Sequence, residues 1–164
     1  MEVTGPFLEQ RAVALATVLL TRHPGVVVTQ SVDDYGFDLQ VHITRSNRFS
    51  GRLFAVILKA RMKLDGIGKL VEGNRVKLRA ELVRALTKSA QAMRDLPFPL
   101  LFMGFSMDTD RAVFGWLRKP LGTGKLENPK IEVAAPWTSE THVDVIRAVE
   151  SWYEARERRP GAQG

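Results

Sequence analysis

The sequence predicts a single α/β domain in which a mixed sheet lies between helices. Its 164 residues suit one domain with one core. Hydrophobic residues make up 45% of the chain and charged residues 26%, the proportions of an ordinary globular protein. Helical and strand-like patterns of apolar residues alternate along the chain, as in α/β folds. We therefore expect one domain over residues 1–155, followed by a polar C-terminal tail over residues 156–164.

The N-terminal region predicts one helix followed by two strands. Apolar residues recur at helical spacing from Gly5-Pro6 until His23-Pro24-Gly25 ends the helix. Residues 26–32 are β-branched or short polar residues, as in a strand, and the turn-forming residues 33–36 follow. Residues 37–44 alternate apolar and polar side chains, which is typical of a second strand with one buried face.

The middle of the chain predicts a third strand and a long helix. Turn-forming residues at Ser46-Asn47 and Ser50-Gly51 precede a continuous apolar run over residues 53–58, which indicates a strand covered on both faces. The Gly-containing stretch 65–74 is typical of a loop. Apolar side chains then recur at helical spacing over residues 76–93 and predict a helix.

The C-terminal region predicts further strands and a last helix. Residues 98–107 are typical of a buried strand, residues 112–117 of a shorter strand, and residues 130–134 of an edge strand. Thr138 or Ser139 can cap the final helix. The order is therefore helix, three strands, helix and strand, with a C-terminal strand and helix added.

One group of polar residues is predicted to meet at the margin of the sheet. Period-two geometry puts Asp38 and Gln40 on one face of the second strand, and Lys59 ends the third strand. If these strands pair as an antiparallel hairpin, Asp38 and Lys59 become neighbours across the ladder. Glu9 joins them if the first helix packs over this margin.

This group has a chemical logic as a phosphodiesterase site. Carboxylates bind hard divalent cations, and a cation with a lysine stabilises the charge that develops on a phosphate during hydrolysis. Each residue also has an ordinary structural explanation. Glu9 can complement the helix dipole, Asp38 can bond to its turn, and Lys59 can be a surface lysine.

Charge gives an independent indication of the partner. The 24 Lys and Arg residues outnumber the 18 Asp and Glu residues, for a net charge of +6. The excess is concentrated in residues 61–88, where a nucleic-acid backbone could bind. A solvated helix face is the alternative explanation. The predicted nucleic-acid-binding residues are Arg61, Lys63, Lys69 and Arg75.

Several other classes of function are disfavoured. The chain has no cysteine, which excludes disulfides, thiolate metal sites and cysteine nucleophiles. Charge-free stretches are too short for a membrane span, and the N-terminus lacks the positive segment of a secretory signal, so we expect a cytoplasmic protein. Residues 122–125 lack the remainder of a phosphate-binding loop. The three histidines lack zinc-ligand spacing, and no Gly-x-Ser-x-Gly motif is present.

Three segments resemble the prokaryotic domain of unknown function 4365, a member of the PD-(D/E)XK nuclease-like superfamily. They are DDYGFDLQV (33–41), GRLFAVILKA (51–60) and PFPLLFMGFSMDTDRAVFGWL (97–117). The resemblance implies a restriction-endonuclease-like core of one helix, three strands, a helix and a strand. It also implies that Asp38 is a metal ligand, that Lys59 is catalytic, that Glu9 is the acid of the first helix, and that the ion is Mg²⁺ or Mn²⁺.

Ile57 departs from the family pattern, which has Glu, Asp or Gln two residues before the lysine. Isoleucine cannot bind a metal. Gln40 could supply a compensating oxygen, metal binding could be weak, or catalysis could be lost. The leading hypothesis is therefore a metal-dependent nuclease that acts on DNA, and the alternative is a catalytically degenerate subunit that binds nucleic acid or protein.

The resemblance also implies a biological setting. Relatives of this family are found in prokaryotic defence systems, some of them joined to short Argonaute partners. Nothing in the sequence resembles such a partner, so we expect any partner protein of this kind to act in trans. A homo-oligomer is compatible with the sequence, and a purely structural subunit is a third possible class.

Overall fold

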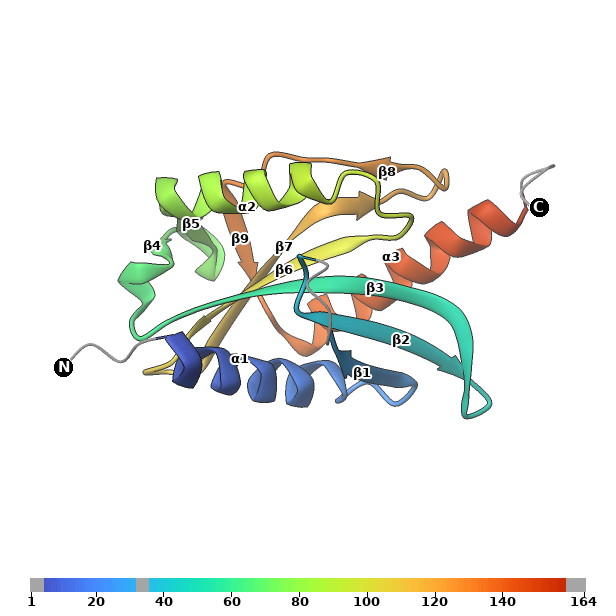
Figure 1. The fold of residues 1–164 in the computed structure, drawn as a ribbon, viewed down its shortest axis with the longest axis horizontal. Helices are drawn as coiled ribbons and strands as arrows, with labels where there is room; N and C mark the ends of the chain where they lie inside the picture. Colours follow the sequence, from blue (N-terminus) through green and yellow to red (C-terminus); the bar gives the residue numbers. More distant parts are fainter. Residues whose placement is uncertain (1–4, 32–35, 159–164) are drawn as a thin grey trace.

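The computed structural model describes residues 5–31 and 36–158 (Figure 1). Within these ranges the chain forms three α-helices and a nine-stranded mixed sheet. The helices are α1 (Gly5–Leu20), α2 (Ala80–Ala92) and α3 (Ser139–Glu157), with short 3-10 helices η1 (Leu64–Gly66) and η2 (Glu72–Asn74). The strands are β1 (Val26–Gln30), β2 (Leu39–Arg45), β3 (Arg48–Arg61), β4 (Gly68–Leu70), β5 (Val76–Leu78), β6 (Leu100–Ser106), β7 (Arg111–Pro120), β8 (Leu126–Glu127) and β9 (Val133–Pro136).

The strand order confirms the predicted α/β class. The strands follow the order β1-β2-β3-β6-β7-β9-β5-β4, and β8 pairs with β7. β1, β2 and β3 are antiparallel neighbours, and β3 lies parallel to β6 after the chain has crossed through β4, β5 and α2. Apart from the small β4 and β5 strands, this is the predicted order of a helix, three strands, a helix and a strand. The architecture is consistent with a restriction-endonuclease-like core.

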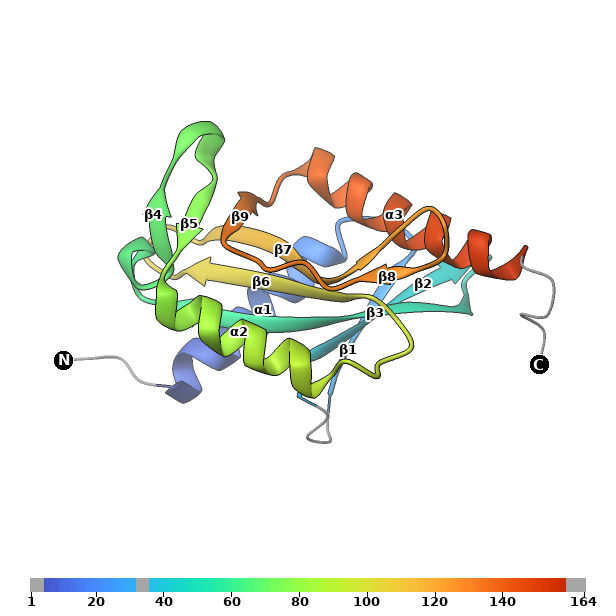
Figure 2. The ribbon, with the colours of Figure 1, turned by 90° about the horizontal axis from the view of Figure 1, so that it is seen from above.

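Two hydrophobic clusters form on the two faces of the sheet (Figures 1 and 2). α1 and α3 cover one face, where α1 buries Ala12, Ala16 and Leu20. α2 covers the other face through Leu82 and Leu86. Because successive side chains of a strand point to opposite faces, β3 and β6 each contribute to both clusters.

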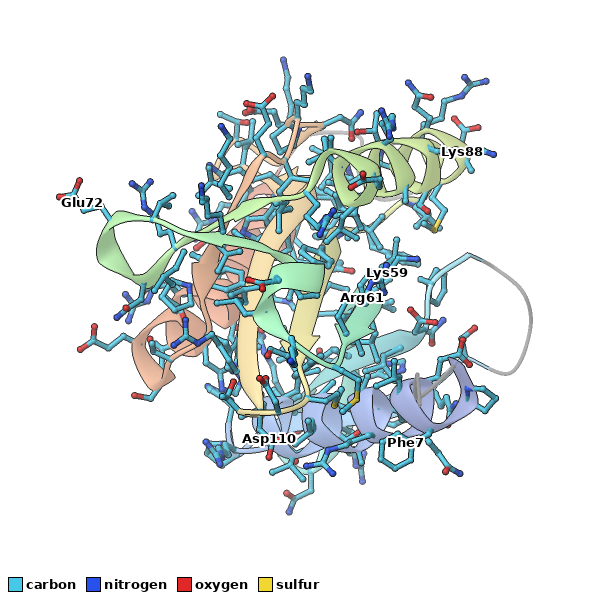
Figure 3. All side chains as sticks on the ribbon, turned by 90° about the vertical axis from the view of Figure 1, so that its left-hand side faces the viewer. Phe7, Lys59, Arg61, Glu72, Lys88 and Asp110 are labelled. Atoms are coloured by element: carbon cyan, nitrogen blue, oxygen red, sulfur yellow. The ribbon has the colours of Figure 1, made fainter. Side chains whose placement is uncertain are left out.

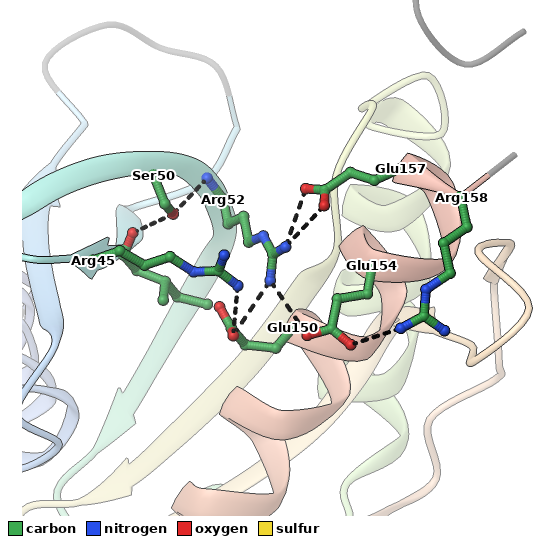
Figure 4. A network of polar contacts seen from close by, with 8 residues as sticks. Arg45, Ser50, Arg52, Glu150, Glu154, Glu157 and Arg158 are labelled. Atoms are coloured by element: carbon green, nitrogen blue, oxygen red, sulfur yellow. Dashed lines mark hydrogen bonds and ion pairs between the residues drawn. The ribbon is translucent and has the colours of Figure 1, made fainter.

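α3 is held to β3 by polar contacts as well as by apolar ones. The guanidinium of Arg52, in β3, is 5% exposed and faces three acids of α3 (Figure 4). Its nitrogens lie 3.3 Å from Glu150, 3.8 Å from Glu154 and 3.0 Å from Glu157. The Tyr153 hydroxyl donates to the Leu53 carbonyl oxygen at 2.7 Å and accepts from the Leu53 amide at 3.1 Å. The C-terminal helix is therefore an integral part of the domain.

The structure corrects the predicted tail and one predicted turn. The tail was expected from residue 156, but α3 continues to Glu157, which binds Arg52. Residues 159–164 lie outside the described part of the chain. Ser50-Gly51 was expected to be a turn, whereas it forms an irregularity within β3, where Gly51 has a φ of 83° and the register with β2 shifts.

Two further corrections concern the region around the predicted long helix. The helix was expected from residue 76, but Val76 lies in β5 and α2 begins at Ala80. The predicted loop 65–74 contains η1, β4 and η2. The predicted edge strand 130–134 is β9, which lies between β7 and β5 rather than at an edge. Strands of three or four residues are too short to show a periodicity, so their pairing is decided by tertiary contacts.

A histidine pair lies where the start of α3 meets the turn after α1. The rings of His23 and His142 have their centroids 5.6 Å apart, and Trp137 lies 5.0 Å from His142. Burial lowers the pKa of His142, and the neighbouring charges of His23 and Arg22 lower it further, whereas a hydrogen bond to the Leu20 backbone raises it. The folded protein therefore favours neutral His142.

The depressed pKa of His142 predicts a loss of stability at acid pH. Below the ordinary value of 6.5, an unfolded chain takes up a proton at this residue that the folded protein resists. The stability contribution is complete above that pH and falls as the pH drops, by at most about 1.4 kcal/mol per pH unit. Thermal melts from pH 7.5 to 5 should show a smaller decline for His142→Gln than for the wild type. Equal declines would contradict this role for His142.

Candidate functional site

The cavity that holds the predicted acids and lysine lies between α1, α2 and the ends of β1, β2 and β3. It has a volume of about 600 Å³. Glu9 comes from α1, Asp38 from the segment before β2, and Lys59 from the end of β3, and all three line this cavity. Figure 3 shows Lys59 and Arg61 in the space between α1 and α2. The fold thus brings together Glu9 and Asp38, which are 29 positions apart in the sequence, and Asp38 and Lys59, which are 21 positions apart.

Asp38 is held against β3 by two hydrogen bonds. Its backbone amide donates to the carbonyl oxygen of Val56 at 2.9 Å, and its Oδ2 accepts from the amide of Leu58 at 2.7 Å. Because β2 begins only at Leu39, the Leu58 amide has no strand carbonyl opposite it. The Asp38 carboxylate takes the place of that carbonyl as hydrogen-bond acceptor. Oδ1 has no hydrogen-bond partner among the described residues.

The three charged groups of the cavity interact electrostatically. The pKa of Asp38 is raised from its ordinary value, chiefly because the cavity walls remove water from its carboxylate. The negative charge of Glu9 raises it further, whereas the Leu58 amide and the Lys59 ammonium lower it. The carboxylates of Glu9 and Asp38 thus repel each other beside the ammonium of Lys59. A divalent cation between the acids would relieve this repulsion.

Ile57 lies on the floor of the cavity, and its side chain belongs to the hydrophobic core. It is 3% exposed and forms part of the cluster under α2, with Leu82 and Leu86. The alternation along β3 puts Ile57 and Lys59 on the same face, as the sequence predicted. Ile57 therefore occupies the position at which the family that the sequence resembles has an acid or Gln. In this chain the side chain at that position presents only hydrocarbon to the cavity.

The amide side chain nearest to the site is not the predicted one. Gln40 pairs with Thr29 and Ala55, two residues further into the sheet than Asp38, and is not among the described residues that line the cavity. Gln30, at the end of β1, does line it. The pairing of Gln30 with Leu39, the residue after Asp38, brings it there. Sequence reasoning missed Gln30 because this pairing was unknown.

The predicted nucleic-acid-binding residues are divided between two places. Arg61 lines the cavity beside Lys59. Lys63 follows β3 at the start of η1, while Lys69 lies in β4 and Arg75 precedes β5. In Figure 2, the β4–β5 hairpin projects away from the sheet. Of these four residues, Arg61 alone appears among the described residues of the cavity wall.

The donor set fits a magnesium or manganese ion that keeps most of its water. Among the described residues, no group of three or more His, Cys, Asp or Glu residues is placed to hold a metal. Two carboxylates, Glu9 and Asp38, line one cavity, and Mg²⁺ is commonly held by one or two carboxylates with water and substrate phosphate oxygens. Glu9 and Asp38 are therefore the residues that could hold such an ion.

Comparisons with known proteins add little to this geometry. No protein-family model matches the chain, and no curated protein matches it in sequence. A similar solved structure is that of D212, a nuclease from a fusselovirus, at 11% sequence identity and a TM-score of 0.39, over 94% of this chain and 98% of that chain. A structural similarity with this TM-score does not assign a function to the chain. Among the described helices, none is long and apolar enough to cross a membrane.

Proposed function

We propose that the cavity is a weak, metal-dependent phosphodiesterase site that acts on DNA. The observation that carries this proposal is the placement of Glu9, Asp38 and Lys59, from three different elements, around one cavity of about 600 Å³. Carboxylates can hold the metal ion of a phosphodiester hydrolase, and a lysine can stabilise the charge that develops on the phosphate. The net charge of +6 favours a polyanionic substrate.

Each residue has a distinct role in this proposal. Glu9 and Oδ1 of Asp38 would hold the ion, which when bound polarises the phosphate and lowers the pKa of water. The Leu58 amide fixes the orientation of Asp38 through Oδ2. Lys59 places a positive charge beside the phosphate, where negative charge develops in the transition state. Arg61 extends this positive charge along the cavity wall.

A second candidate function is nucleic-acid binding without cleavage. The observation that favours it is the burial of Ile57, which removes the third oxygen donor from the floor of the site. A role in prokaryotic defence, with a partner protein in trans, is supported by the sequence resemblance. Both candidate functions are compatible with that setting.

The discriminating experiment is a cleavage assay with plasmid and single-stranded DNA in Mg²⁺ or Mn²⁺. The wild type should cleave slowly, and Lys59→Ala should reduce the rate by about 100-fold or more, as expected when an electrostatic group is removed from the transition state. Asp38→Asn should abolish cleavage. Arg147→Gln, an exposed change on α3, is the matched control and should cleave like the wild type.

Asp38→Asn also separates loss of function from loss of fold. The raised pKa of Asp38 means that its ionised form is unfavourable in the folded protein above that pKa. Asparagine removes the charge and can still accept from the Leu58 amide, so its melting temperature should equal or exceed that of the wild type at pH 7. Mn²⁺ should raise the melting temperature of the wild type and leave that of Asp38→Asn unchanged. Metal-independent cleavage, or equal cleavage by both proteins, would refute the catalytic proposal.

A further inference from the structure

A basic groove runs along the side of α2 that faces away from the candidate site. Two adjoining cavities, of about 660 Å³ and 380 Å³, share Thr87, Gln91 and Lys130 and therefore form one groove. Its walls are α2 on one side and β5 with the segment 128–132 on the other. Figure 3 shows Lys88 projecting sideways from α2, apart from Lys59 and Arg61.

The charge of this groove is strongly one-sided. Its lining includes five cations and one acid, Glu132, which pairs with Lys130 at 3.3 Å. The cations are Lys77, Arg84, Lys88, Arg94 and Lys130. Among the described residues, the first four of these form no ion pair. Five cations against one acid in one groove create a field that attracts a polyanion.

The floor of the groove explains why these cations stay together. Leu78 and Leu117, with Ile131, are buried beneath it and belong to the cluster under α2. The groove is therefore attached to the rigid core rather than to a mobile surface segment. Arg84 and Lys88 lie one helical turn apart on α2, about 6 Å along the axis, so they can contact neighbouring phosphates of one strand.

A path of basic residues connects the groove with the candidate site. A cavity of about 350 Å³ shares Lys59 and Arg61 with the site and extends to Arg79, at the start of α2, where one acid, Glu81, pairs with Arg79 at 3.4 Å. Lys77, two residues earlier, already lines the groove. The positive side chains thus continue from the site around the N-terminal end of α2.

We infer that this groove binds the phosphate backbone of the nucleic acid outside the cleavage site. The class of ligand, a nucleic acid, rests on the proposed function. The place where it binds rests on the groove itself. It assigns backbone contacts to Arg84 and Lys88 of α2, which belong to the basic stretch 61–88 of the sequence but not to the four residues named there as nucleic-acid-binding. Such contacts are independent of metal and of base sequence.

The test is binding of fluorescein-labelled duplex and single-stranded DNA in EDTA at several salt concentrations. Arg84→Gln/Lys88→Gln replaces two exposed cations by a good helix former. It should weaken duplex binding by about tenfold or more at 0.1 M salt, and reduce the salt slope by about 1.8, because each lost phosphate contact removes about 0.9. Arg111→Gln/Arg147→Gln, two exposed cations outside the groove, is the matched control for net charge.

The outcomes separate this inference from the proposed function. A selective loss of binding in the α2 variant, with an unchanged melting temperature, supports the groove whether or not the wild type cleaves DNA. An equal loss in both double variants would show that net charge alone matters, and would overturn the inference. Absence of wild-type DNA binding at low salt would also overturn it and would favour an acidic protein as the ligand.

Discussion

Arg52→Ala is expected to lower the free energy of unfolding by about 1.5–3 kcal/mol, the range for losing hydrogen bonds to a charged group, because Arg52 is buried while its acidic partners are partly exposed. Arg52 is 4% exposed, and its guanidinium neutralises Glu150, Glu154 and Glu157 of α3. Without it, three like charges would face the sheet along one side of a helix. Glu150 Oε1 is already buried without a hydrogen-bond partner among the described residues, so its environment would become still less favourable.

Urea unfolding at pH 7 measures this effect, and two variants serve as controls. Arg45→Ala removes the exposed partner of Glu150, at 3.4 Å, and should cost less than about 1 kcal/mol. Arg52→Lys keeps the charge but loses the paired hydrogen bonds to Glu157, of 3.1 and 3.0 Å, and should lie between the other two. A value for Arg52→Ala as small as that for Arg45→Ala would show that the network contributes little to stability.

Ile57→Glu is expected to destabilise the metal-free protein by about 3 kcal/mol, because a carboxylate would replace a side chain that is 3% exposed within the core under α2. For a chain of this size, that corresponds to a fall of about 6–12 °C in melting temperature. The same side chain would border the cavity beside Asp38 and Lys59. It would thus supply the oxygen donor that the site lacks.

Mn²⁺ should therefore restore part of the lost stability, and the gain in melting temperature should exceed that of the wild type. Cleavage of plasmid DNA should rise together with this metal response. Ile57→Met keeps an apolar side chain of similar volume and should change stability by less than about 1.5 kcal/mol, with no gain in metal response. A lower melting temperature for Ile57→Glu with no response to Mn²⁺ and no cleavage would show that the metal site has been dismantled.

The fold and the candidate site differ in how far the sequence predicts them. The helices and the long strands were predictable because each repeats its hydrophobic pattern over many residues. Asp38 and Lys59 were predictable as neighbours because hairpin pairing of β2 and β3 follows from their short separation, and the structure places both on the cavity wall. Their chemical roles, and that of Glu9, stay predictions.

The parts that sequence could not provide all depend on contacts between distant segments. Gln30 enters the site through its register with Leu39, and the basic groove exists because the segment 128–132 returns to lie beside α2. Arg52 is an unremarkable charged residue in the sequence, and only the docking of α3 buries it.

By itself, the sequence determined the α/β class, the order of the core elements and the pairing of Asp38 with the end of β3, since local periodicity and short-range pairing specify these. Tertiary structure alone decided the position of β9 between β7 and β5, the burial of Arg52, and the placement of Lys130 beside the cations of α2. The physical reason is that burial and charge clustering are properties of the three-dimensional neighbourhood. Residues brought there from distant parts of the chain leave no local pattern in the sequence.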